Sequence, residues 1–382
     1  MPGPLDDLLI IDLSRVLAGP YATMLLSDLG ARVIKVERPG VGDDSRAIGP
    51  FLGDQSAYFA SINRGKQSIA LDLKLPEDRS VFEALLARAD VLVENYRPGV
   101  LRKLGYGWET LSARYPRLIV AAVSGFGQTG PDAKKAAYDM VVQAMGGIMS
   151  VTGWPGGPPT RVGTSVGDIT AGLFTVTGIL AAVHDRARPG PQQGRGQLVD
   201  VSMLDGQIAI LENAIARYAV TGESPGPLGA RHGSITPFAA FACADGHVVI
   251  AAGNDALWAA LAKALDLPPD PRFASNPSRT AHWQAVAAAI EAVLVHHPVA
   301  HWLAVLDKAG VPVGQIQNIE QALNHPQVRA RNMVIETAFP DGTPLLAAGN
   351  PVKLSGHDDP AVRPAAPALD GDRAAILREL GL

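Results

Sequence analysis

Several features of secreted, membrane or nucleic-acid-binding proteins are scarce or missing in this sequence of 382 residues. It contains one cysteine, Cys243, so no disulfide can form within the chain, and a reducing cytoplasm is the compartment that fits. We expect Cys243 to be a small buried residue on a strand at 238–243. Charge is nearly balanced, with 33 basic and 37 acidic residues, which gives no general reason to expect nucleic acid or an anionic membrane as a partner.

Long hydrophobic stretches are missing as well. The most apolar run, at 169–183, is interrupted by Thr and Gly and is shorter than the roughly 20 residues that cross a bilayer. The amino terminus, MPGPLDDLLIIDLS, is acidic before it is apolar and lacks the basic region of a signal peptide. We therefore expect a cytoplasmic protein without a membrane span, and its 47% hydrophobic residues are enough for two domains.

The first third of the chain alternates short apolar runs with helical segments. Strands are predicted at 8–13, 32–37, 91–95 and 118–124, and helices at 20–29 and 81–89. This alternation predicts the α/β class, with a parallel sheet covered by helices on both faces. Ligands of such sheets bind beyond the carboxyl ends of the strands, which here are followed by the loops 14–20, 38–44, 95–100 and 125–131.

The remainder of the chain predicts a second, smaller domain. Residues 1–220 are expected to form the large domain, with a strand at 197–201 and a helix at 204–218, and the Gly- and Pro-rich residues 221–237 a linker. Residues 238–333 are expected to form an α+β domain that starts with a hairpin turning at Asp245-Gly246 and continues with helices at 255–265, 282–295 and 301–309. Residues 334–382 carry strand-like pieces, a Pro-rich stretch and a closing helix at 372–380.

The segment VGTSVGDITAG at 162–172 is the most informative in the sequence. It places Asp168 between a glycine-rich turn and an apolar helix that extends to about residue 186. A carboxylate at a helix start faces unpaired N–H groups and the positive end of the helix dipole, which favour its ionised form. We therefore expect Asp168 to act as a nucleophile at neutral pH.

The same segment also fits a competing interpretation. Gly163-x-Ser165-x-Gly167 matches the nucleophile elbow of serine hydrolases. An elbow needs a hydrophobic strand that leads into the serine, whereas WPGGPPTRV at 154–162 predicts a loop. A capping or turn role suits Ser165 better, and a hydrolase stays open as an alternative.

GFGQTG at 125–130 fits the glycine pattern of a dinucleotide site. It follows a predicted strand, but Pro131 comes next and no acidic residue lies about 20 positions further on to bind a ribose. A nicotinamide or flavin cofactor is therefore not expected.

Three histidines, His296, His297 and His301, cluster late in the chain. Pro298 interrupts their helical spacing, and no Asp, Glu or Cys completes a set of metal ligands nearby. We expect solvated histidines at a helix boundary and no metal site.

Cations are frequent at or just after the predicted strand ends, where a ligand with phosphates would bind. They are Arg15, Arg38, Arg46, Arg64, Lys66, Lys74, Arg97, Arg102 and Lys103. Asn95, Tyr96 and Arg97, followed by Pro98-Gly99, combine an amide, an aromatic ring and a cation in one turn. That combination suits a purine nucleotide with phosphates, although ordinary solvated surface explains most of these charges.

Together these segments resemble the class III CoA-transferase family, also called the CaiB–BaiF family. The matching stretches are LIIDLSRVLAGPYATMLLSDLGARVIKVERPGVGD, NRGKQSIALDLK, ADVLVENYRPGVLRKLGY, GFGQTGP, YDMVVQAMGGIMSVTG, VGTSVGDITAG, GRGQLVDVSMLDG and ADGHVVIAAGND. They run in order from about residue 5 to beyond 351, over nearly the whole chain.

The resemblance implies a fold and an assembly. The large domain is expected to be Rossmann-like and discontinuous, with the C-terminal segment returning to it after the small domain. It also implies an intertwined homodimer, in which each subunit is an open ring threaded through the other.

The resemblance also implies roles for individual residues, with coenzyme A as the acyl-CoA substrate and Asp168 as the catalytic nucleophile. The positions expected to contact CoA are Val16, Arg38, Leu71, Lys74, Asn95, Tyr96, Arg97, Lys103 and Tyr138. Tyr58, Arg231 and His232 are expected to face the acyl or acid substrate. Lys103 stands where relatives often have a phosphate-binding arginine, and Ala136 replaces a lysine, so Lys134 or Lys135 would have to supply part of the phosphate contact.

The implied reaction moves CoA from an acyl-CoA donor to a carboxylic acid through an aspartyl anhydride and an aspartyl-CoA thioester. Arg231 suggests an acceptor with a second carboxylate, such as a short dicarboxylic acid, with an exposed Arg–His pair as the equal alternative. The glycine-rich loop typical of formyl-CoA:oxalate transferases is not found.

Two further alternatives remain. A 2-methylacyl-CoA racemase needs two bases at the α-carbon, and its relatives have a histidine where this chain reads Ala137-Tyr138-Asp139. Tyrosine, with an ordinary pKa near 10, is a poor base, which favours the transferase. A non-enzymatic acyl-CoA-binding protein would not need an acidic residue at a glycine-flanked helix start.

Overall fold

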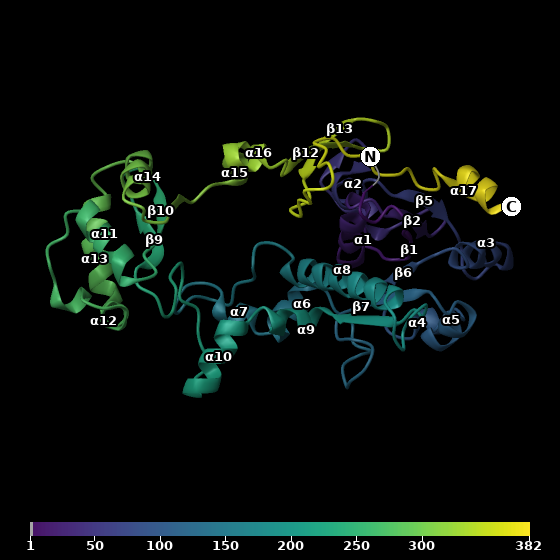
Figure 1. The fold of residues 1–382 in the computed structure, drawn as a ribbon, viewed down its shortest axis with the longest axis horizontal. Coiled ribbons are helices and arrows are strands. Elements are labelled where there is room, and N and C mark those ends of the chain that lie inside the picture. Colours follow the sequence, from purple (N-terminus) through teal and green to yellow (C-terminus); the bar gives the residue numbers. More distant parts are fainter. Residues whose placement is uncertain (1–2) are drawn as a thin grey trace. The chain divides into compact units, whose positions relative to one another are not determined.

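The structure, a computed structural model, describes residues 3–382, which form two compact units (Figure 1). Unit 1 contains the residues up to 149, 161–220 and 325–382, and unit 2 contains 150–160 and 221–324. Compared with the expected bounds, 150–160 and 221–237 lie in unit 2, where Gly229 donates a backbone hydrogen bond of 2.8 Å to Gly153. Residues 325–333 lie in unit 1, where the Asn332 amide donates to the carbonyl of Asp359 at 2.9 Å.

A sheet of six parallel strands forms the centre of unit 1. In spatial order they are β5 (Gln67–Ala70), β2 (Arg32–Glu37), β1 (Leu9–Asp12), β6 (Val91–Glu94), β7 (Ile119–Ser124) and β8 (Leu198–Ser202). The chain fills one half of the sheet outward from β1 and then the other half outward from β6, as in a doubly wound Rossmann-like fold. This confirms the predicted α/β class with a parallel sheet. Ligands of such folds bind where the strand order reverses, here between β1 and β6.

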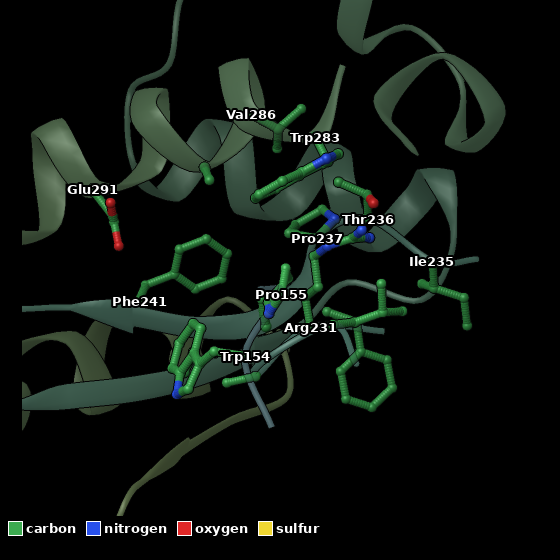
Figure 2. A pocket seen from close by; sticks show the side chains of 16 residues that line it. Trp154, Pro155, Arg231, Ile235, Thr236, Pro237, Phe241, Trp283, Val286 and Glu291 are labelled. Carbon is green, nitrogen blue, oxygen red and sulfur yellow. The ribbon is translucent and has the colours of Figure 1, made fainter. Parts of the chain in front are cut away.

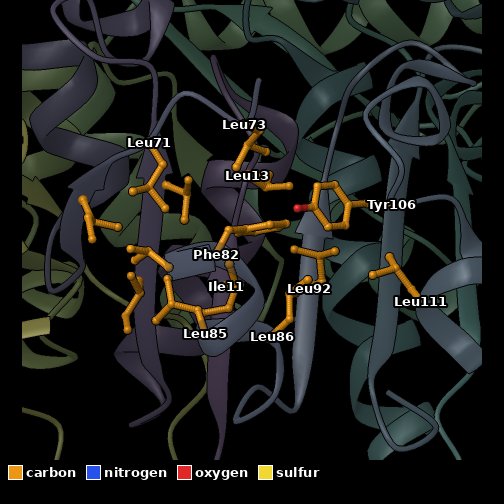
Figure 3. Packing of buried hydrophobic residues seen from close by; sticks show 14 of the residues in the cluster. Ile11, Leu13, Leu71, Leu73, Phe82, Leu85, Leu86, Leu92, Tyr106 and Leu111 are labelled. Atoms are coloured by element: carbon orange, nitrogen blue, oxygen red, sulfur yellow. The ribbon is translucent and has the colours of Figure 1, made fainter. Parts of the chain in front are cut away.

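Helices cover both faces of this sheet because neighbouring strand residues point to opposite sides. Ile10 packs toward the face covered by α1 (Ala18–Asp28) and α8 (Val166–Ala187). Ile11, the next residue, packs toward the face of α3 (Pro76–Leu86) and α17 (Arg373–Leu380). Figure 3 shows this second cluster, in which the Phe82 and Tyr106 rings meet edge to face with centroids 5.0 Å apart. The two buried layers fix the strand ends on which the candidate site is built.

The helix α8 ends at Ala187, close to the expected end at about residue 186. Its 22 residues have the length and composition of a membrane-spanning helix, which contradicts the expectation that no apolar run is long enough. The buried residues of this helix include Thr170, Ala171, Gly172, Thr175, Ile179 and Ala182. It packs against α1 and the strands β7 and β8, as the core helix of a folded unit does.

The other elements of unit 1 are shorter. They are β3 (Phe51–Leu52), β4 (Gln55–Ser56), α2 (Ala57–Asn63), α4 (Val100–Lys103), α5 (Trp108–Arg114), α6 (Asp139–Met145), α7 (Ile148–Val151, which extends into unit 2), α9 (Met203–Ala209), α10 (Glu212–Thr221), α16 (Pro326–Ala330), β12 (Val334–Ala338) and β13 (Pro344–Ala348). Two 3-10 turns lie at Asp44–Ala47 and, in unit 2, Pro271–Phe273. The single helix predicted at 204–218 is wrong, because the chain breaks at 210–211 into α9 and α10.

Unit 2 has its own small sheet and core. Its antiparallel strands are, in spatial order, β11 (Val313–Gln315), β10 (His247–Ala251) and β9 (Phe238–Ala242), and its helices are α11 (Asp255–Ala264), α12 (Asn276–Ala281), α13 (Trp283–Leu294), α14 (Val299–Lys308) and α15 (Ile319–Asn324). The predicted hairpin is confirmed as β9–β10. Cys243 directly follows β9 and is buried, as expected.

Candidate active site

The loops after β1 and β6 are joined at the point where the strand order reverses. The Asn95 side chain donates from Nδ2 to the carbonyl of Arg15 at 2.7 Å, and its Oδ1 accepts from the Arg15 N–H at 2.9 Å. Asn95 therefore fixes the backbone that leads from β1 into α1.

Asp168 lies in the first turn of α8 and also near the start of α1. The helices α1 and α8 can approach closely because Gly172 has no side chain; a Cβ there would lie 2.9 Å from the carbonyl oxygen of Ala18. The backbone N–H of Ala18, at the start of α1, faces the Asp168 carboxylate and lowers its pKa. Leu17, the residue before α1, gives that helix no side-chain cap. Its first N–H groups can therefore serve an anion.

The protonation of Asp168 differs from what the helix dipole alone suggests. Burial, and then charge repulsion from Asp139, raise the pKa of the Asp168 carboxyl to about 7, against the Ala18 N–H, which lowers it. The helix start is outweighed because a partly buried anion loses hydration and meets a second carboxylate. Burial, and then the charge of Asp168, also raises the pKa of Tyr58 to about 12, which places this phenol near the carboxylate.

Two residues that the sequence analysis gave no role hold the turn before Asp168. Asp139 accepts from the Gly167 N–H at 2.8 Å and from the Gln143 side chain at 2.7 Å. Gln143 in turn accepts from the Val162 N–H at 2.9 Å. Gly167 permits this approach, since a Cβ there would lie 3.0 Å from Oδ1 of Asp139. The only signal in the sequence was the spacing of Asp139 and Gln143 by one helical turn, which also fits an ordinary exposed helix.

Ser165 occupies the residue before α8 but makes no capping hydrogen bond through its side chain. Residues 158–165 carry neither helix nor strand, so the described chain has no strand leading into an elbow at this serine. The geometry therefore favours Asp168 over Ser165 as the reactive group.

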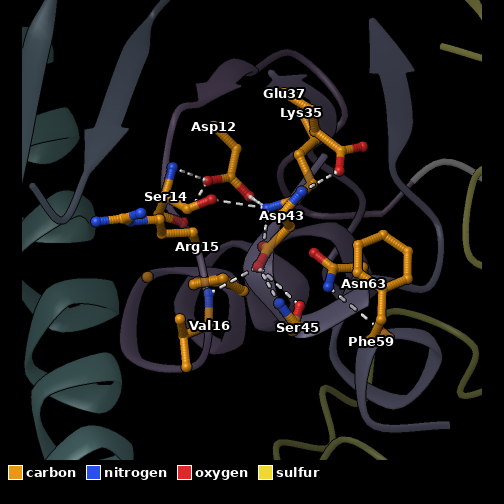
Figure 4. A network of polar contacts seen from close by, with 12 residues as sticks. Asp12, Ser14, Arg15, Val16, Lys35, Glu37, Asp43, Ser45, Phe59 and Asn63 are labelled. Atoms are coloured by element: carbon orange, nitrogen blue, oxygen red, sulfur yellow. Dashed lines mark hydrogen bonds and ion pairs between the residues drawn. The ribbon is translucent and has the colours of Figure 1, made fainter. Parts of the chain in front are cut away.

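A buried network of charges lies directly beneath the loop between β1 and α1 (Figure 4). Asp12, at the end of β1, accepts from Lys66 at 3.0 Å and from Thr23 at 2.7 Å. Lys35, on β2, donates to the Ser14 carbonyl at 2.7 Å and pairs with Asp43 at 2.8 Å. Burial alone would raise the pKa of the Asp12 carboxyl, but Lys66 and Lys35 reverse the effect and hold it far below its usual range.

Four of the expected CoA contacts lie together. Arg38, Leu71, Lys74 and Tyr96 line one cavity of about 450 Å³ beyond the ends of β1, β2 and β5. Asp44 is paired with Arg38 at 2.7 Å and with Arg15 at 2.8 Å, so it competes with a ligand phosphate for both cations.

The remaining expected contacts do not line this cavity. Arg97 lines a neighbouring cavity of about 380 Å³ together with Lys134, whereas Lys135 is paired with Asp132 at 2.8 Å. Lys103 is exposed at the end of α4, and Tyr138 is 76% exposed at the start of α6. Val16 and Tyr58 pack against the same small apolar cluster as α1.

Glu94 is a further buried acid that the sequence analysis missed. It ends β6, lines the same cavity as Arg97 and accepts from the Tyr96 N–H at 2.7 Å. Burial raises the pKa of the Glu94 carboxyl to about 7 against that hydrogen bond. Because Glu94 ends an apolar strand run, the sequence gave no sign that it would be a buried acid lining a cavity.

The expected substrate residues Arg231 and His232 belong to unit 2. Arg231 lines an apolar cavity of about 300 Å³ (Figure 2), with its guanidinium 4.5 Å from the centre of the Trp283 ring. His232 stacks on Phe238 at 5.4 Å and accepts from the Ser234 N–H at 3.1 Å. The cavity combines aromatic walls with one cation.

Within residues 3–382, no group of three or more His, Cys, Asp or Glu side chains is placed to hold a metal ion. His297 and His301 stack at 4.2 Å, and both rings contact Trp302 edge to face.

Comparison with known proteins places these features in a family. The model of CoA-transferase family III matches residues 5–373. The chain is 50% identical to an acetyl-CoA:oxalate CoA-transferase of Acetobacter aceti, over 99% of this chain and 96% of that protein. It is 40% identical to a succinyl-CoA:mesaconate CoA-transferase of Haloarcula hispanica, over 100% and 97%. A crystal structure of a CAIB/BAIF family protein from Brucella suis superposes with a TM-score of 0.87 at 38% identity and covers all of both chains.

Proposed function

We propose a specific reaction for this chain, which belongs to CoA-transferase family III and is an enzyme of that family. The enzyme moves CoA from an acyl-CoA donor to a short dicarboxylic acid, with Asp168 as the covalent nucleophile. The observation that carries this proposal is the half-buried Asp168 carboxylate at the start of α8, which the Ala18 N–H faces from the start of α1.

The reaction begins when the Asp168 carboxylate attacks the thioester carbonyl of the donor. The C–S bond breaks, which leaves a mixed anhydride on Asp168 and a CoA thiolate. That thiolate attacks the aspartyl carbonyl, so the donor acid leaves and an aspartyl-CoA thioester remains. The acceptor carboxylate then attacks the carbonyl of this thioester, which releases the CoA thiolate and leaves an anhydride between Asp168 and the acceptor. The thiolate finally attacks the acceptor carbonyl of that anhydride, which gives the acceptor acyl-CoA and frees the Asp168 carboxylate. No metal or ATP is needed because the thioester energy is conserved.

The surroundings of Asp168 suit this sequence of steps. Backbone N–H groups at the start of α1 and in the glycine-rich turn before α8 can stabilise the oxyanions that form at the attacked carbonyls. Burial, which raises the pKa of Asp168 to about 7, also keeps water from the anhydride. At neutral pH a large fraction of Asp168 is still ionised and able to attack.

The cavities of unit 1 fit CoA as the substrate. Arg38 and Lys74 supply cations, Tyr96 an aromatic ring and Leu71 an apolar wall in one cavity, and Arg97 and Lys134 line the next. Phosphates pair with the cations, and the apolar parts of the carrier pack on the walls.

The acceptor class rests on a cation and on the relatives. The names of two relatives include oxalate and mesaconate, which are dicarboxylic acids, and a succinyl group, which derives from one. Arg231, stacked on Trp283, is a guanidinium that can pair with the second carboxylate of such an acid.

A homodimer is proposed as the working form. The adjoining helices α6, α8 and α9 expose apolar side chains on their surface: Met140, Met145, Leu173, Phe174 and Ile208. A second copy of the chain, intertwined with the first, would cover them. Light scattering coupled to gel filtration should give twice the mass of the chain, and a stable monomer would contradict this assembly.

The racemase alternative is weaker because Tyr138 replaces the histidine base and is 76% exposed. One panel of assays tests the function: acetyl-, succinyl- and 2-methylacyl-CoA donors, each with oxalate, succinate, mesaconate and acetate as acceptors. The proposal predicts CoA transfer to at least one dicarboxylic acid and no exchange of the α-proton. Exchange of that proton without transfer would establish a racemase instead.

A further inference from the structure

The loop between β1 and α1 holds one residue in an unfavourable backbone conformation. Val16 has a φ of +66°, in the left-handed region that β-branched residues avoid because the side chain crowds the backbone. Such a residue persists only where its surroundings hold it, and these positions gather at functional sites.

Asp43 holds Val16 in place. Its Oδ1 accepts from the Val16 N–H at 3.0 Å and from the N–H and hydroxyl of Ser45, both at 2.8 Å. Its Oδ2 pairs with Lys35 at 2.8 Å, and its own N–H donates to Glu37 at 2.9 Å. Asp43 is 4% exposed, so water cannot replace the Val16 N–H as the hydrogen-bond partner of Oδ1 (Figure 4).

The orientation of Val16 decides where the next N–H groups point. Leu17 follows as the residue before α1 and gives no side-chain cap, and the N–H of Ala18 then faces the Asp168 carboxylate, where α1 and α8 approach so closely that a Cβ at Gly172 would lie 2.9 Å from the Ala18 carbonyl oxygen. A change of φ at Val16 would turn these groups away from the carboxylate. No substrate group has to touch Asp43 for this effect.

We propose that Asp43 is a positioning residue for CoA transfer: by holding Val16 in the left-handed conformation, it aims the Ala18 N–H at the reacting carboxylate. This inference rests on the proposed function, because it takes Asp168 as the nucleophile.

The chain offers a matched control at the other end of α1. The Asp28 side chain is 4% exposed and pairs with Arg64 at 2.6 Å, and it bonds to neither Val16 nor Ala18. Asp28→Ala should lower the stability of the fold but leave the rate of adduct formation by the folded protein unchanged.

The experiment is a double-mutant cycle. The full-length protein is mixed with succinyl-CoA, quenched at millisecond intervals and analysed by intact mass for the CoA adduct on Asp168. Asp43→Ala should slow adduct formation by about 100-fold, the size of effect that a misplacement near 1 Å has on a reacting group. Adduct formation is measured at saturating succinyl-CoA, so that a change in CoA binding through Val16 does not enter the rate.

The cycle is repeated in a Val16→Gly background. Glycine adopts the left-handed conformation without help, so the loss caused by Asp43→Ala should shrink there to about a tenth of its size in the parent. Asp43→Asn, which fills the same space, is carried through the same cycle so that an unfolded alanine variant does not end the test; its loss should be smaller and again relieved by glycine.

The outcomes separate the two proposals. Equal losses in both backgrounds would reduce Asp43 to a structural role and overturn the inference, as would an adduct rate in the Asp43 variants equal to that of the parent. If the parent protein itself forms no adduct on Asp168, the proposed function fails instead.

Discussion

Two carboxylates near the start of α1, Asp12 and Asp168, have opposite protonation behaviour. Asp12 is fully buried, but Lys66 contacts it at 3.0 Å and Lys35 lies 4.0 Å away, so its pKa stays far below the usual range. Asp168 is less buried, yet its nearest charged influence is another carboxylate, Asp139, and its pKa rises to about 7. Burial raises the pKa of both carboxyls, but only Asp12 has cations beside it that reverse the effect.

The two sites therefore respond to pH in opposite ways. Because the pKa of Asp12 is lowered in the fold, its contribution to stability is present above the ordinary value of 3.8 and is lost as the pH falls below it. The pKa of Asp168 is raised, so its contribution is present below 3.8 and is lost as the pH rises through about 7. The lowered pKa of Asp12 fits a structural role, and the raised pKa of Asp168 fits the reactive role proposed for it.

Replacement of Asp168 should have the largest effect. Asp168→Asn should lower CoA transfer by at least about 1,000-fold, because the amide cannot form the anhydride, while the Kd for CoA stays within a few-fold. Steady-state transfer and calorimetry measure the two quantities. Full transfer activity in this variant would end the proposed mechanism.

The same variant gives a pH-dependent test of stability. Asp168→Asn removes an acid that is costly to ionise, so the thermal midpoint should rise, and more at pH 8 than at pH 5. Calorimetric scans at both values check this. A larger gain at pH 5 would mean that the pKa of Asp168 is not raised.

Removal of the structural carboxylate should affect folding instead. Asp12→Ala leaves the buried Lys66 without its carboxylate partner and should lower the free energy of unfolding by about 3–5 kcal/mol. Urea unfolding monitored by tryptophan fluorescence measures the loss, with the exposed Asp6→Ala as the control that should change little. A stable, inactive Asp12→Ala protein would move Asp12 into the reaction.

The cation of unit 2 tests the acceptor class. Arg231→Ala should lower kcat/KM for oxalate or mesaconate about tenfold more than for acetate, because a second carboxylate loses its charged partner. Arg272→Ala, an exposed arginine of the same unit paired with Asp270, serves as the control. Equal losses for mono- and dicarboxylic acids would remove Arg231 from acceptor recognition.

The smallest effect should come from the neighbour of Asp168. Asp139→Asn keeps an acceptor for the Gly167 N–H but removes the negative charge, so the pKa of Asp168 should fall. Adduct formation, which falls below pH 7 in the parent, should then persist to a pH lower by about one unit. Asp132→Asn, a change at a carboxylate that comes earlier in the chain and is paired with Lys135, should leave the pH profile unchanged. An unchanged profile for Asp139→Asn would mean that burial alone raises the pKa.

The sequence predicted the parts of the fold that repeat a pattern. Apolar runs located β1, β2, β6 and β7, and the turn residues Asp245-Gly246 located the hairpin of unit 2. β5, with the sequence QSIA, was missed because it has no apolar run and becomes a strand only by pairing with β2. Its edge is covered by the C-terminal segment, where Asp370 and Asp372 accept its N–H groups at 2.7 and 2.8 Å.

At the candidate site, the sequence located the proposed nucleophile, Asp168, but not its environment. The glycine-flanked helix start predicted the position of Asp168 correctly. Its raised pKa could not be predicted, because it depends on Asp139, 29 residues earlier, and on an N–H group of α1, which only the packed structure brings together. The left-handed Val16 was equally invisible, since nothing in a β-branched residue predicts that conformation.

The central claim is that the Asp168 carboxylate becomes covalently linked to CoA during turnover. The protein should be incubated with succinyl-CoA, trapped with hydroxylamine, digested and mapped by mass spectrometry. The account predicts that the peptide spanning Gly163–Gly172 carries a hydroxamate on Asp168, and that Asp168→Asn carries none. A peptide modified at Ser165, or an unmodified peptide from an enzyme that is turning over, would contradict it.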